Sequence, residues 1–220
     1  MKKWLILILV VCLCAIGFVK RANATLLTNG DAELGTISGW TTDYTGATSG
    51  NTAIIDAVSS GPYSQLFPPP SGDYIFSFIQ QYANQTWNEA ATISMSQSGS
   101  IGDMDHISLS GYYANFDDYG EAVLSFYDSS DQLLGAISSG SLNTSPVNLE
   151  WTYFDIYSSV PDNAVMWNVK LSATLMVGNF TDVYWDDIQL TERPVPEPAT
   201  MLLLGIGLIG LAALRKKIRK

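Results

Sequence analysis

Apolar and polar residues alternate with a period of two through the middle of the chain. Gly, Ser, Asn, Asp and Pro separate the alternating runs, the clearest of which cover residues 53–58, 74–78, 91–95, 107–112, 122–127, 151–156, 167–171 and 183–188. Such alternation is typical of half-buried β-strands, and residues 128–131 have the composition of a hairpin turn. The pattern predicts nine or more short strands in an all-β fold, a single β-sandwich of the jelly-roll type.

The N-terminal apolar stretch has the three parts of a secretory signal peptide. Two lysines precede 16 consecutive apolar residues, 4–19, and small residues follow at Ala22 and Ala24. We therefore predict a signal peptide at 1–24, which signal peptidase removes after Ala24. Two basic residues shortly before this site leave an uncleaved membrane anchor as the alternative. Both cysteines of the chain lie in this stretch, so the mature protein contains no disulfide.

The C-terminal end also has three parts. A linker at 193–198 contains Pro196-Glu197-Pro198, an apolar stretch at 199–214 follows, and a basic tail occupies 215–220. At 1.5 Å per residue the apolar stretch spans roughly 24 Å as a helix, less than the ~30 Å hydrocarbon core. The basic tail is predicted to be cytoplasmic, which places all preceding residues outside the inner membrane. The alternative interpretation of these residues is a plain single-span tail anchor.

Taken together, the order of Pro-Glu-Pro, short apolar helix and basic cluster resembles the PEP-CTERM sorting signal. The resemblance implies that an exosortase, a membrane cysteine peptidase, recognises the tail and cleaves near Pro196, Glu197 and Pro198. It also implies a Gram-negative host that makes exopolysaccharide. The protein is then expected at the inner membrane first, and at the cell surface or outside the cell after cleavage.

Residues 25–192 are predicted to form one domain, and its charge is strongly acidic. Lys170 is its only basic residue, against 20 Asp and Glu, for a formal charge near -19. Such a surface repels the phosphates of nucleic acids and anionic lipid headgroups, so neither is an expected partner of this domain. The same surface attracts cations, although solubility in a salty extracellular medium is also sufficient to explain the excess of acidic residues.

Short motifs at the two ends of the domain suggest a family. Asn29-Gly30 with Glu33, followed by Gly39-Trp40, opens the domain, and residues 186–190, Asp-Asp-Ile-Gln-Leu, close it. This series resembles the galactose-binding-like jelly rolls, which include many carbohydrate-binding modules. The resemblance implies a structural calcium ion that ties the first strand to the last. Ala32 departs from the family pattern, which usually has a large apolar residue there.

The calcium ligands implied by this resemblance are Glu33 with Asp186 or Asp187. Calcium binds carboxylate and carbonyl oxygens, which suits all three residues. Strict strand alternation places Asp186 on the face of Tyr184, Ile188 and Leu190, the predicted core side, where a carboxylate needs a cation or hydrogen-bond donors. This favours Asp186 over Asp187. The alternative is that Glu33 accepts backbone hydrogen bonds and that both aspartates are solvated.

Carbohydrate binding requires aromatic rings beside polar groups, because sugars stack their C–H faces on flat side chains. The sequence offers Trp87, which is surrounded by amide side chains, and three tyrosines in the dense aromatic segment 112–121: Tyr112, Tyr113 and Tyr119. Four other tryptophans alternate with apolar neighbours and are predicted to be in the core: Trp40, Trp151, Trp167 and Trp185.

Nothing in the sequence indicates catalysis. His106 is the only histidine, and no phosphate loop, zinc ligand set or dinucleotide-binding pattern occurs. We therefore expect a non-enzymatic surface or matrix protein that engages exopolysaccharide. Two alternatives stay open: an adhesive module that binds other proteins, and a small glycan hydrolase that uses a carboxylate pair.

Overall fold

In the computed structural model, residues 25–44, 52–59, 69–81, 92–115, 118–142, 150–176, 181–193 and Gly207 are described. The predicted signal peptide, nearly all of the predicted tail and Trp87 lie outside these residues. No helix among the described residues is long and apolar enough to cross a membrane.

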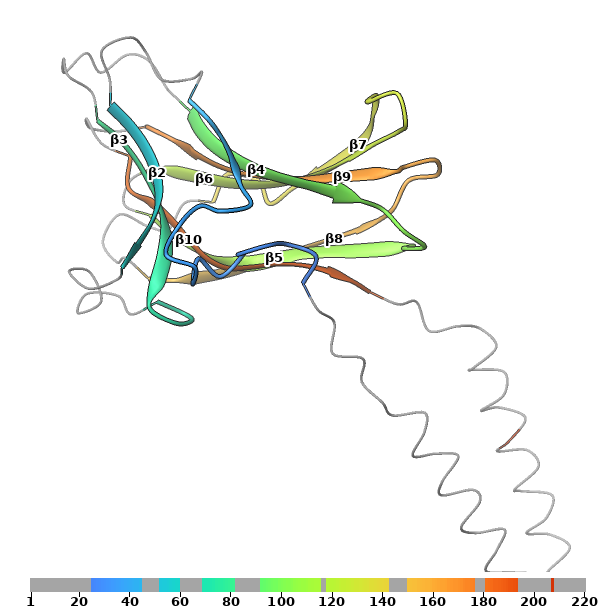
Figure 1. The fold of residues 1–220 in the computed structure, drawn as a ribbon, viewed down its shortest axis with the longest axis horizontal. Helices are drawn as coiled ribbons and strands as arrows, with labels where there is room; N and C mark the ends of the chain where they lie inside the picture. The colour runs from blue at the N-terminus through green and yellow to red at the C-terminus, as the bar shows by residue number, and fades with distance from the viewer. Residues whose placement is uncertain are drawn as a thin grey trace, which may run out of the picture.

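Two five-stranded antiparallel sheets pack face to face (Figure 1). Sheet I has the strand order β1-β4-β9-β6-β7 and sheet II the order β2-β3-β10-β5-β8. The strand bounds are β1 Thr41–Asp43, β2 Thr52–Ser59, β3 Tyr74–Gln81, β4 Thr92–Ser100, β5 His106–Asn115, β6 Tyr119–Tyr127, β7 Leu133–Ser138, β8 Thr152–Ser159, β9 Met166–Thr174 and β10 Val183–Glu192. The prediction of an all-β sandwich is confirmed, and each of the eight alternating runs overlaps a strand.

The hairpin predicted at residues 128–131 joins β6 to β7. Asp128 closes it, because its Oδ1 accepts the backbone N–H groups of Ser130 at 2.8 Å and Gln132 at 3.0 Å. Asp131 has a φ of 60°, a left-handed conformation that Asp tolerates in turns. The composition of this turn therefore predicted the antiparallel pairing of two strands.

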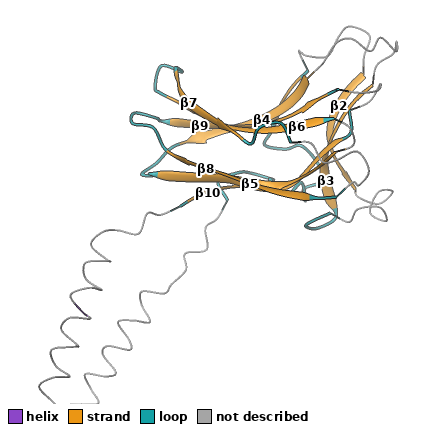
Figure 2. Cartoon of the chain, turned by 180° about the vertical axis from the view of Figure 1, so that it is seen from behind, coloured by secondary structure: helices purple, strands orange, loops and turns teal. Residues whose placement is uncertain are grey.

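The hydrophobic core lies between the two sheets, which Figure 2 shows as two layers of strands. Trp185 of β10 is fully buried and meets the ring of Phe154 edge-on, with 5.8 Å between centroids. Trp40 and Trp167 are buried in the same core, as predicted. Trp151 is partly buried and packs instead against a second, smaller apolar cluster of Ile75, Ala114 and Tyr184, on the outer face of sheet II.

The N-terminal segment, residues 25–40, is bound to the last strand. The backbone N–H of Leu26 donates to the carbonyl of Leu190 at 2.7 Å, and the N–H of Ile188 donates to the carbonyl of Gly30 at 2.8 Å. Every strand and the whole core therefore lie between the two ends of residues 25–193. This part of the chain has the anatomy of an independent folding unit.

The register of β10 contains a bulge between Asp186 and Gln189, and Asp187 in this bulge has a φ of 47°. Before the bulge, Trp185 points into the core; after it, Ile188 and Leu190 do so as well. Tyr184 belongs to the outer cluster. Asp186 follows the inward-pointing Trp185 and therefore lies on the same outer side as Tyr184. The predicted shared face of Asp186, Ile188 and Leu190 is thus wrong, because the extra residue reverses the alternation.

Candidate functional site

The Glu33 carboxylate binds the backbone of the loop that leads into β3. Its Oε1 accepts the backbone N–H groups of Asp73 and Tyr74, each at 2.9 Å. Gly72, between Ser71 and Asp73, has a φ of +52°, and a Cβ there would overlap the Glu33 carboxylate. This is the arrangement that the sequence offered as the alternative to metal binding by Glu33.

The Asp186 carboxylate binds the same loop through Ser71. Its Oδ2 accepts the backbone N–H of Ser71 at 3.1 Å, and its Oδ1 accepts the N–H of Asp187 at 2.7 Å and the Ser71 hydroxyl at 3.4 Å. The side chain is completely buried although it lies on the outer face, so it is not a solvated edge charge. Burial raises the pKa of Asp186 from 3.8 to about 7, against the hydrogen bonds from Ser71 and Asp187.

Asp187 has a different role from its neighbour. It occupies the bulge and accepts the side-chain N–H of Gln189 at 2.8 Å. Within the described part of the chain, no three His, Cys, Asp or Glu side chains are close enough together to hold a metal ion. A cation at this loop would therefore rest on Glu33 and Asp186, with further oxygens from the backbone.

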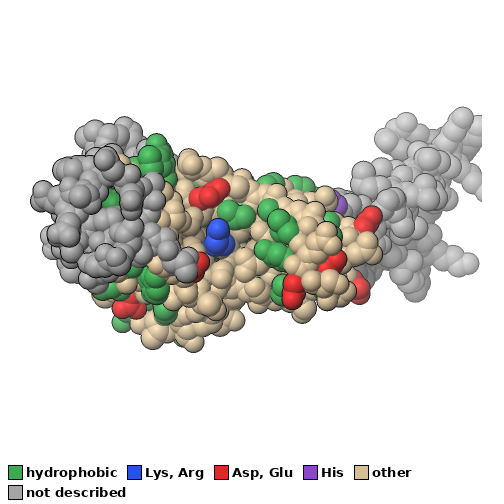
Figure 3. All heavy atoms as spheres, turned by 90° about the horizontal axis from the view of Figure 1, so that it is seen from above, with side chains coloured by type: hydrophobic (Ala, Val, Ile, Leu, Met, Phe, Trp, Pro, Cys, Tyr) green, Lys and Arg blue, Asp and Glu red, His purple; other side chains and the backbone are tan. Residues whose placement is uncertain are grey.

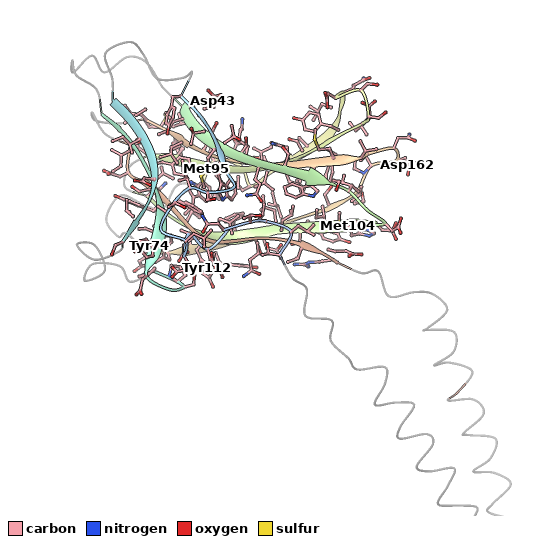
Figure 4. The ribbon with its side chains drawn as sticks, in the orientation of Figure 1. Asp43, Tyr74, Met95, Met104, Tyr112 and Asp162 are labelled. Carbon is pink, nitrogen blue, oxygen red and sulfur yellow. The ribbon has the colours of Figure 1, made fainter. Side chains whose placement is uncertain are left out.

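A strip of tyrosines lies on the outer face of sheet II, beside Asp186. Register pairs Tyr112 of β5 with Asp186 on one side and with Tyr153 of β8 on the other. The rings of Tyr112 and Tyr153 are 5.3 Å apart between centroids, and 55% of Tyr153 is exposed. Figure 4 shows Tyr112 on this outer side of sheet II.

The strip continues along β8 to Tyr157, which is 47% exposed. The ring of His106 stacks on it at 5.3 Å between centroids, and the guanidinium of Arg193 lies 5.6 Å from its centroid. Asp155 lies between Tyr153 and Tyr157 on β8. Its Oδ2 accepts the guanidinium of Arg193 at 2.6 Å, and its Oδ1 accepts the hydroxyl of Ser108 at 2.5 Å. We call Tyr112, Tyr153 and Tyr157 the tyrosine strip.

The predicted ligand-binding residues do not form one group. Tyr113 points into the core and is 4% exposed, so its ring offers no face to a ligand; burial also raises the pKa of its hydroxyl. Tyr119 lies on the outer face of sheet I, paired with Thr174. Of the tyrosines named from the sequence, only Tyr112 is in the strip.

Tyr153 and Tyr157 were missed by sequence analysis. The alternation in 151–156 already places Tyr153 opposite to Phe154, whose side chain is in the core. What the sequence could not supply is the partner strand, because Tyr112 and Tyr153 meet only through the register of β5 with β8. The one signal available was that these aromatic residues alternate with core residues.

The C-terminal tail matches a known sequence motif. Residues 194–217 match the PEP-CTERM protein-sorting motif, which confirms the predicted resemblance. The motif marks an exported protein that an exosortase sorts. It begins directly after Arg193, the last described residue of the sandwich. No curated protein matches the chain.

The sandwich resembles several solved structures. TmCBM61 in complex with β-1,4-galactotriose gives a TM-score of 0.51 at 16% identity, over 77% of this chain and 99% of that one. The enzymatically active domain of bacteriophage CBA120 tailspike protein 4 gives 0.53 at 14% identity, over 77% of this chain.

The CBM22-1–GH10 modules of Clostridium thermocellum xylanase 10B, complexed with xylohexaose, give 0.50 at 12% identity, over 76% of this chain and 28% of that one. This chain spans only about a fifth of the tailspike domain, 21% of its length. At such identities these likenesses establish the fold alone: a jelly-roll β-sandwich of the kind that carbohydrate-binding modules have.

Proposed function

We propose that this chain is an exosortase-sorted surface or extracellular-matrix protein whose β-sandwich binds carbohydrate, with exopolysaccharide as the ligand and without catalysis. The observation that carries the proposal is the tyrosine strip. Tyr153 is 55% exposed and Tyr157 is 47% exposed, so both leave apolar surface in contact with water, although His106 and Arg193 also contact the ring of Tyr157.

The chemistry of the strip suits a sugar polymer. Pyranose rings place C–H groups on their faces and hydroxyls on their rims, so they pack on aromatic rings while bonding to polar groups beside them. Ser110 and Asp155 are paired between the rows that hold Tyr153 and Tyr157, and supply such groups. The resemblance of the fold to carbohydrate-binding modules supports the same function.

Binding to the strip can be tested with residues 25–193 by affinity electrophoresis in gels that contain neutral polysaccharides. Tyr153→Ala is expected to weaken binding about tenfold, which corresponds to the binding free energy that one aromatic contact contributes. The matched control is Leu133→Ala on β7, where a large side chain is 53% exposed on the other sheet. Failure of the folded domain to bind any polysaccharide overturns the proposal, and release of reducing sugar overturns its non-catalytic part.

We also propose that Glu33 and Asp186 hold a structural calcium ion. The support is that Asp186 is completely buried, that no cationic side chain among the described residues is bonded to it, and that calcium prefers carboxylate oxygens. Calcium is expected to raise the melting temperature of residues 25–193, and EDTA to lower it. An unchanged melting temperature in EDTA contradicts this site, and Asp186→Asn should abolish the calcium response.

Before processing, the proposed transmembrane segment 199–214 holds the domain outside the inner membrane, and exosortase then releases it. The support is the sorting motif at 194–217. Mass spectrometry of the mature protein from an exosortase-positive host tests this step. A mature chain that still carries residues 215–220 contradicts it.

A further inference from the structure

Arg193 fixes the point at which the chain leaves the sandwich, on the outer face of sheet II. Its guanidinium binds Asp155 of β8 at 2.6 Å and lies 5.6 Å from the ring centroid of Tyr157. Its backbone N–H donates to the carbonyl of His106 at 3.0 Å. Five residues, 194–198, separate Arg193 from the proposed transmembrane segment. At no more than ~3.5 Å per residue, its Cα therefore lies within about 21 Å of the hydrocarbon core while the tail is anchored.

Arg193 stands where two surfaces of the sandwich meet, the outer face of sheet II and the end formed by three loops, 101–105, 128–132 and 160–165. The loops adjoin, because the N–H of Val160 donates to the carbonyl of Asp105 and the N–H of Val165 donates to the carbonyl of Tyr127. The headgroup region of a bilayer is only about 5–8 Å thick on each side. So short a tether therefore brings one of the two surfaces close to the headgroups.

The loop end is unsuited to this contact. Its exposed carboxylates belong to Asp103, Asp105, Asp131 and Asp162, and its three loops contain no Lys or Arg. Figure 4 labels Asp162 at this end, and Figure 3, which is seen from the side of sheet I, shows acidic side chains gathered there. Anionic headgroups such as phosphatidylglycerol repel such a surface.

The outer face of sheet II beside Arg193 has a different character. Register across β10, β5 and β8 gives the rows Thr191–Ser108–Tyr157 and Gln189–Ser110–Asp155, next to the pair His106–Ser159. Asp155 is the only carboxylate in these rows, and Arg193 binds it. Glu192 pairs instead with Ile107, whose side chain is in the core. The bulge residue Asp187 is six residues from Arg193, about 20 Å along a strand.

We propose that, before processing, this face lies on the headgroups of the membrane and contacts them through Tyr157, Tyr153 and Arg193. The two tyrosines are 47% and 55% exposed, and tyrosine is enriched at membrane–water interfaces because its ring is apolar and its hydroxyl polar. A guanidinium has five N–H donors, so Arg193 can bind lipid phosphate as well as Asp155. Leu26, bonded to the end of β10, is 39% exposed and adds apolar surface.

The tether makes a weak contact sufficient. A domain with a formal charge near -19 and two exposed tyrosines on this face is expected to bind vesicles poorly from solution. A short tether supplies an effective concentration on the order of mM, which is lost when the tail is cleaved. The inference rests on the proposed function and adds its regulation: the tyrosine strip is covered by the membrane until release frees it for polysaccharide.

Fluorescence quenching in vesicles of phosphatidylethanolamine and phosphatidylglycerol tests this contact. Both cysteines of the chain lie in the predicted signal peptide, so one cysteine introduced into residues 25–220 takes a fluorophore at a single place. Ser159→Cys places it beside His106 on sheet II, and Ser100→Cys is the matched control at the same end of sheet I. Both serines are exposed. Nitroxide-labelled headgroups are expected to quench the label at position 159 and to spare the label at position 100.

Three changes are expected to abolish or reduce the quenching at position 159. These are truncation to residues 25–193, Tyr153→Ala, and an insertion of about 20 Gly and Ser residues after Arg193, which spans roughly 25 Å as a flexible coil. Equal quenching of both labels overturns the inference, because the sandwich then stands on its loop end. An unquenched label at position 159 in the anchored chain also overturns it, as does full quenching in Tyr153→Ala with an unchanged melting temperature.

Polysaccharide binding separates this inference from the proposed function. Neutral polysaccharide is expected to bind residues 25–193 but not the vesicle-anchored chain. If the released domain binds no polysaccharide while the label at position 159 is quenched, the proposed function fails and the membrane contact stands. Equal binding by both forms with an unquenched label overturns the membrane contact alone. A chain 25–220 that does not float with the vesicles overturns both the proposed segment 199–214 and this inference.

Discussion

Arg193 donates through its guanidinium to Asp155 Oδ2 at 2.6 Å, which fastens the last residue before the sorting motif to strand β8. The backbone N–H of Arg193 also donates to the carbonyl of His106 at 3.0 Å. The chain is thus held to the sandwich up to the residue at which the matched motif, 194–217, begins.

Removal of this contact should loosen the end of β10 without unfolding the domain. Arg193 and Asp155 are 49% and 31% exposed in their side chains, so water screens the pair and its worth is below about 1 kcal/mol. In a double-mutant cycle, Arg193→Ala and Asp155→Asn are expected to give a coupling energy of roughly 0.2–1 kcal/mol, which is the usual range for exposed ion pairs. Hydrogen exchange at Glu192 and Arg193 should accelerate; unchanged exchange contradicts the anchoring role.

Asp186 should make the metal-free domain less stable as the pH rises. Its pKa of about 7 in the folded state lies above the ordinary 3.8, so the folded state binds this proton more tightly than the unfolded state. The group has no effect below the unfolded value, and its destabilising effect grows up to about pH 7, reaching at most about 4 kcal/mol. Carboxyl NMR titration in EDTA should give a midpoint near 7 that calcium lowers. A midpoint near 4 in EDTA contradicts this prediction.

Gly72→Ala should be more destabilising than Gly140→Ala. Both glycines have positive φ, +52° and +72°, so each alanine carries backbone strain of about 1 kcal/mol. Only at Gly72 does the added Cβ meet another group, the Glu33 carboxylate, while Gly140 has open space. Urea unfolding should show an extra loss of about 2 kcal/mol for Gly72→Ala, because Glu33 must release two backbone N–H groups. Equal losses would show that Glu33 is not held as described.

Asp118→Ala should be far more destabilising than Asp128→Ala, although each carboxylate accepts two backbone N–H groups. Asp118 is completely buried and accepts from Met176 at 2.8 Å and Asp182 at 3.0 Å. Its loss leaves two part-buried backbone N–H groups without these acceptors and removes a buried side chain that holds both, at about 2–4 kcal/mol. Asp128 closes an exposed turn where water takes over, for less than about 1 kcal/mol. Similar melting temperatures for the two variants would contradict the burial argument.

Much of the fold could be predicted from local sequence, because alternation records which side chains face a core. The eight runs became strands, and Trp167 and Trp185 became core residues, since a strand with one buried face must repeat every second residue. The sorting motif could also be predicted from the sequence, because it is a contiguous stretch whose chemistry does not depend on a partner strand.

The site was less predictable, because it depends on register. Asp186 was assigned to the core face, and a single extra residue at Asp187 moved it to the outer face. Tyr112 was named without Tyr153, since the two rings meet only when β5 and β8 pair.

The sequence by itself therefore determined the sandwich, its core and the sorting signal of this protein. Only the tertiary structure decided that Arg193 binds Asp155, that Glu33 and Asp186 hold one loop, and which side chains share a row. The physical reason is that burial is a property of each strand, whereas a surface site is made by the pairing of strands distant in sequence, and one bulge changes that pairing.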